Sequence, residues 1–149
     1  MMSTYSILSI IHNIGVSLGV GSATLGLIIN IKASKNPDFK LVSMKIRPLI
    51  SQIIWVALIL LGISGTFLMN PAVTMDIDYM FSGIKHVIVI VIVMNGIILT
   101  LLGKKIGKIA PKPENPPSKE FLKASKTAQL LGFITVACWY VVIILSSFI

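Results

Sequence analysis

The sequence predicts an all-α integral membrane protein, a four-helix antiparallel bundle with both termini on the outer side of the membrane. Three observations predict this fold: an apolar composition, four long apolar segments, and basic residues confined to alternate loops. Apolar residues make up 55% of the 149 residues and charged residues only 12%, which is outside the usage of soluble domains. Crossing a hydrocarbon core about 30 Å thick takes about 20 helical residues. We therefore expect residues 1–149 to form a single membrane domain.

Four segments are long enough to span, at about 6–31, 49–69, 82–102 and 127–148. The first has no Lys or Arg among its opening ten residues, so we expect it to stay in the product as a span and not to be removed as a signal peptide. The second ends at Met69-Asn70-Pro71. All four are rich in Ile, Val and Leu, and helix is predicted because an isolated lipid-facing strand cannot satisfy its own backbone.

Basic residues predict the topology. Twelve of the thirteen lie in the first and third loops, and the second loop instead carries Asp76 and Asp78. By the positive-inside rule, the first and third loops are cytoplasmic, so a multi-pass protein of the cell (inner) membrane with both termini outside is expected. This topology also explains the net charge of +8, and no nucleic-acid binding is expected. The third loop, residues 103–126, is rich in Pro and Lys and is interpreted as a tether, with docking of a cytoplasmic partner as the alternative.

Three ionisable side chains lie within the apolar segments: His12 in the first, and Lys85 and His86 in the third. Such residues are costly inside a membrane and therefore suggest a functional site. With a helical rise of 1.5 Å per residue, His12 and His86 lie about 9 Å and about 6 Å below the outer boundary. The first and third spans run in the same direction, so these side chains can meet at one depth and share a ligand.

Small residues follow His12 along one face of the first span. Gly15 and Gly19 continue the helical period through Ala23 and Gly26. A face without side chains beneath a histidine leaves a flat slot, as a porphyrin needs, and this predicts a haem b bound through His12. The alternative is that the small residues only allow close packing between helices.

Lys85 and His86 are about 100° apart around a helix, so only one can point straight at His12. With His86 inward, two histidines ligate the iron. With Lys85 inward, its amine pairs with a propionate, supplies a proton in catalysis, or ligates the iron. Lys85 can instead extend to the outer interface.

The patterns IIHNIGVSLGVGSATL in the first span and GIKHVIVIVIVMNG in the third resemble a loose superfamily of small four-helix membrane proteins. This superfamily includes copper-resistance CopD-type domains and HemJ-type protoporphyrinogen oxidases. The second span is also similar, with Arg47 ahead of an apolar run. The resemblance implies that His12 and Lys85 correspond to the histidine and lysine implicated in haem binding and catalysis. His86 is supported by depth alone.

We therefore expect a b-type haem-binding redox protein that transfers electrons or oxidises a quinol-like or porphyrinogen-like substrate near the outer face. The expected partners are the lipid bilayer and a quinone or porphyrin. One alternative is a small non-catalytic subunit of a larger membrane complex. Another is copper handling at the outer face, because thioethers suit Cu(I) and three methionines lie in or beside the outer loop. These are Met69, Met75 and Met80.

Overall fold

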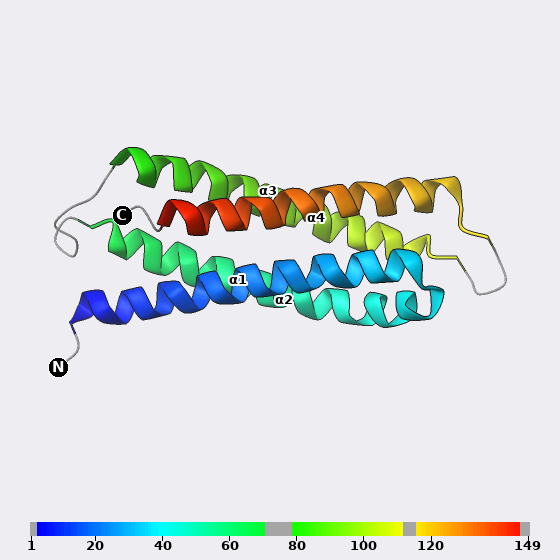
Figure 1. The fold of residues 1–149 in the computed structure, drawn as a ribbon, viewed down its shortest axis with the longest axis horizontal. Coiled ribbons are helices and arrows are strands. Elements are labelled where there is room, and N and C mark those ends of the chain that lie inside the picture. Colours follow the sequence, from blue (N-terminus) through cyan, green and yellow to red (C-terminus); the bar gives the residue numbers. More distant parts are fainter. Residues whose placement is uncertain (1–2, 71–78, 112–115, 147–149) are drawn as a thin grey trace.

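A computed structural model describes residues 3–70, 79–111 and 116–146. Within these ranges the chain forms four helices: α1 (Thr4–Lys35), α2 (Pro37–Leu68), α3 (Tyr79–Lys108) and α4 (Lys119–Ser146). Each is long and apolar enough to cross a membrane. Figure 1 shows the four helices running along one axis, with α1 beginning and α4 ending at the same end of the molecule. The prediction of an all-helical protein with four helices long and apolar enough to span a membrane is confirmed.

The first connection is shorter than the hydropathy pattern suggests, because Asn36 alone separates α1 from α2. The Asn36 N–H donates to the carbonyl of Lys32 at 3.0 Å and ends α1. Its side-chain oxygen accepts from the N–H of Phe39 at 3.5 Å, the interaction of a helix N-cap. Pro37 then occupies the first helical position, where the missing N–H costs nothing. Most of the predicted loop is therefore helix.

The third connection also differs from the predicted tether at 103–126. Helix α3 continues to Lys108, and α4 begins at Lys119 after Ser118, whose Oγ accepts the N–H of Phe121 at 3.1 Å. Lysine is a good helix former, so a helix continues beyond its apolar segment until a residue stops it. Here the stop is the proline-containing stretch that starts at Pro111. Residues 112–115 lie outside the described ranges.

The helices pack as two antiparallel pairs. Helix α1 packs most extensively on α2, and α3 on α4; α1 also packs on α4, whereas the α2–α3 interface is the smallest. No interface joins α1 and α3 in the described part of the chain, so these two helices lie diagonally across the bundle. Side chains of α1 and α3 can therefore approach one another only through the bundle interior.

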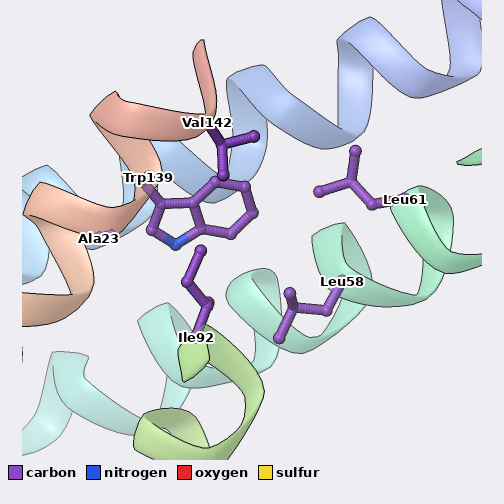
Figure 2. Close-up of a cluster of buried hydrophobic side chains, with 6 residues drawn as sticks. All are labelled: Ala23, Leu58, Leu61, Ile92, Trp139 and Val142. Carbon is purple, nitrogen blue, oxygen red and sulfur yellow. The ribbon is translucent and has the colours of Figure 1, made fainter. Parts of the chain in front are cut away.

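Two buried clusters form the core. One lies in the middle of the bundle and is built around Trp139, which is only 1% exposed. Figure 2 shows its indole ring pointing from α4 toward Ile92 of α3 and toward Leu58 and Leu61 of α2. The other cluster joins the lysine-rich ends of α3 and α4. It contains Ile106, Phe121, Ala124 and Ala128.

Candidate functional site around His12

His12 is half-buried on α1 and is held by α2. Its Nδ1 lies 3.1 Å from Oγ of Ser64, a residue with no exposed surface. The Ser64 hydroxyl donates its hydrogen to the carbonyl of Leu60 at 2.6 Å. A serine hydroxyl has one hydrogen, so in the bond to His12 the imidazole Nδ1–H must donate and Ser64 Oγ must accept. In the neutral ring, the other nitrogen, Nε2, then carries a lone pair.

The position of the ring also depends on Gly65. A Cβ added at Gly65 would lie 3.8 Å from Cε1 of His12 and 4.0 Å from Nδ1. The imidazole therefore rests at ordinary contact distance above a residue without a side chain. Ser64 and Gly65 together set both the tautomer and the location of the His12 ring. A ligating histidine usually donates its second N–H to a neighbouring group in this way.

Helix α3 buries Lys85 more than His86. Lys85 is partly buried on α3, at the same end of the bundle as His12. His86 is exposed, and its Nδ1–H donates to the carbonyl of Ser82 one turn earlier at 2.7 Å. Of the two candidate partners, Lys85 is therefore the less exposed one.

The small residues below His12 are covered by neighbouring helices. A Cβ at Gly15 would lie 3.0 Å from Cγ of Leu61 on α2, and one at Gly19 would lie 2.3 Å from Cη2 of Trp139 on α4. The flat slot expected at Gly19 exists, and the ring that fills it is the protein's own indole. In this structure both glycines allow helices to pack closely.

Ser64 was not identified from the sequence. A signal for it is present, because Ser64 lies four residues from the end of α2 at the same end of the bundle as His12. A hydroxyl at that depth is a natural partner for the imidazole.

Within the described residues, the methionines and acids form no compact metal centre. Met69 and Met80 are exposed at 36% and 66%, and Met75 lies outside the described residues. Among the residues that the structure describes, no group of three His, Cys, Asp or Glu side chains could hold a metal ion.

Fold and site together define a multi-pass membrane protein of four helices with a half-buried, serine-anchored histidine between α1 and α2. Comparison of the chain with family models, with curated proteins and with solved structures finds no match. The resemblance to CopD-type and HemJ-type proteins stays a prediction.

Proposed function

We propose that the region around His12 binds a b-type haem near the outer face of the membrane and that the protein acts in a redox reaction. The observation that carries this proposal is the hydrogen-bond chain from His12 Nδ1–H to Ser64 and from Ser64 to Leu60. It leaves Nε2 of His12 as a lone-pair donor of the kind that binds haem iron.

His12 offers an iron ligand and Lys85 a positive charge, so these side chains suit a haem. Neighbouring side chains also limit where the haem ring can lie. Leu61 and Trp139 cover the faces of Gly15 and Gly19, so the plate does not belong there. The α2–α3 interface is the smallest in the bundle, and it lies between the helices that carry Ser64 and Lys85. We assign that side of His12 to the haem.

Each nearby side chain has a distinct part in this proposal. When bound, the haem supplies one-electron chemistry at its iron. His12 would bind the haem iron through Nε2, and Ser64 fixes the tautomer and orientation of the His12 ring. Lys85 carries a positive charge at the same end of the bundle, suited to pairing with a propionate or to delivering a proton to a quinone-like or porphyrin-like substrate. His86 faces away and is not assigned a ligand role.

The orientation of the protein in the membrane is part of the same proposal. The ends of α1 and α2 that meet at Asn36, and the ends of α3 and α4 near Lys108 and Lys119, carry the lysine-rich segments and are placed in the cytoplasm. The His12 end then faces outward, with both termini, in the cell membrane.

Visible spectroscopy tests the proposal. The protein is purified in mild detergent from cells supplied with a haem precursor, and spectra are recorded before and after dithionite reduction. We expect a Soret band with sharp reduced α and β bands. His12→Ala should abolish them, and the matched variant His86→Ala should retain them. A colourless but folded protein, or equal loss in both variants, would overturn the assignment.

A further inference from the structure

A groove between α3 and α4 lies at the lysine-rich end of the bundle, far along the chain from His12. It has a volume of about 290 Å³ and combines apolar and charged walls. Leu102 and the buried Ala124 form the apolar part. Lys105 and Lys123 form the cationic part, and Glu120 and Thr127 complete the lining. The groove is therefore amphipathic and lies where two membrane-spanning helices reach the polar interface.

Positive charge exceeds negative charge around this groove in the part of the chain that the structure describes. Lys105 makes an ion pair with Glu120 at 2.8 Å. Lys123 has no carboxylate partner in the described part of the chain, and Glu120 is the one acid at this end whose side chain the structure describes. Four further exposed lysines surround the pair of helix ends. They are Lys104, Lys108, Lys119 and Lys126.

We infer that this groove binds the headgroup of an anionic phospholipid. A lipid phosphate would accept from the Lys123 ammonium and would share the Lys105 ammonium with Glu120, while the adjoining glycerol and acyl chain contact Leu102 and Ala124. Basic pockets between membrane helices bind anionic headgroups for this reason, and each nearby lysine contributes through electrostatic attraction. This inference is independent of any haem.

Native mass spectrometry of the purified full chain tests the site with phosphatidylglycerol and phosphatidylcholine of identical acyl chains. We expect phosphatidylglycerol to bind more tightly, and Lys105→Gln/Lys123→Gln to weaken it by about fivefold per lysine. The matched control is Lys104→Gln/Lys108→Gln, which removes the same charge outside the groove lining. Inorganic phosphate should not compete, since it lacks the acyl chain.

Two results would overturn the inference. One is an equal loss of phosphatidylglycerol binding in the groove variant and in the control, which would mean that only total charge matters. The other is equal binding of the two lipids to the unmodified protein. Thermal unfolding of both variants without added lipid shows that each remains folded.

A separate observation concerns the side of α1 that is exposed on the surface of the bundle. Asn13 is exposed within an apolar span, and its amide makes no hydrogen bond within the described residues. It lies in a shallow hollow with the exposed Ser17, lined further by Ile10, Ile14 and Leu18. Lipid chains cannot satisfy an amide, and polar side chains on membrane helices commonly bond across helix interfaces.

We propose that this face pairs with a second copy of the chain. All copies insert with the same orientation, so a two-fold axis along the membrane normal places Asn13 opposite Asn13 at equal depth. An amide both donates and accepts hydrogen bonds, which makes it complementary to itself, and such a pair is isologous. The neighbouring Ser17 leaves room for the partner helix to approach.

Disulfide cross-linking in membranes tests this pairing in a Cys138→Ser background, which removes the one native cysteine. Ile10→Cys and Ser17→Cys should each form dimers with themselves, whereas Leu130→Cys, which is 62% exposed on α4, should not. Asn13→Leu should lower the dimer fraction by about threefold to tenfold. Equal cross-linking at all three positions, or no effect of Asn13→Leu, would overturn the proposal.

Discussion

At the scale of single residues, the most informative contact is the one between His12 and Ser64. The Ser64 hydroxyl donates its only hydrogen to the Leu60 carbonyl. The neutral imidazole of His12 must therefore carry its hydrogen on Nδ1 to bond with Ser64. Sequence reasoning identified His12 and placed Lys85 at a matching depth. It could not identify Ser64 as the anchor or show that His86 points outward, because helix rotation is set by packing and not by span length.

The tautomer can be measured directly. In a His86→Gln background, one histidine remains, and ¹⁵N NMR of labelled protein should show Nδ1 protonated and Nε2 unprotonated in the neutral ring. Ser64→Ala removes the acceptor, so the second tautomer should become populated. Ser51→Ala, the same change elsewhere on α2, should leave the spectrum unaltered. An identical spectrum in the Ser64 variant would contradict the proposed bond.

Gly19 gives a second prediction at this scale. A methyl group there would overlap the Trp139 ring at 2.3 Å, and overpacking of this kind costs about 1–3 kcal/mol. We expect Gly19→Ala to lower the thermal unfolding midpoint in detergent. Gly21→Ala is the control, because a Cβ at Gly21 meets nothing within 4 Å; it should be neutral or stabilising. Equal midpoints for the two variants would contradict the observed packing.

At the scale of the helices, α1 and α2 form a hairpin joined by Asn36 and fastened by a polar contact. Arg47 of α2 donates through Nη2 to the side-chain oxygen of Asn30 on α1, and its Nε is buried without a partner in the described structure. Hydropathy predicted both spans well. It could not predict that the intervening polar residues are helical, since exposure to water does not end a helix.

The Asn30–Arg47 contact can be tested by changing only the acceptor. Asn30→Ala leaves the partly buried guanidinium with one fewer partner and should cost about 1–3 kcal/mol of stability. Asn30→Asp keeps an acceptor oxygen and adds a negative charge beside the cation, so it should retain or raise stability. Thermal unfolding in one detergent at neutral pH measures both. Loss of stability in the aspartate variant would show that the contact is not formed.

At the scale of the whole molecule, the helix ends that carry the lysine-rich segments lie at one end of the bundle (Figure 1). His12 lies toward the other end, near the start of α1. This separation follows from four antiparallel spans and was predictable from the distribution of charge. The packing of side chains in the interior could not be predicted from the sequence. Residues such as Trp139 and Gly19 are distant in sequence and meet only when α4 packs on α1.

Topology is tested by cysteine labelling in intact cells, again in the Cys138→Ser background. A membrane-impermeant thiol reagent should label Ser3→Cys, which we place outside. It should label Ser118→Cys only after the membrane is permeabilised, because the start of α4 is placed in the cytoplasm. The reverse pattern would invert the orientation and would move the His12 site to the cytoplasmic face.

The contact between Trp139 and Gly19 also bears on the order of assembly. The α1–α2 hairpin is local in sequence and is synthesised before α4, the helix that carries Trp139. Until α4 arrives, the surface of Gly19 has no indole on it and the middle of the bundle is incomplete. Docking of α4 is thus the step that seals the interior, and the emission of a single tryptophan, in a Trp55→Phe background, would time it.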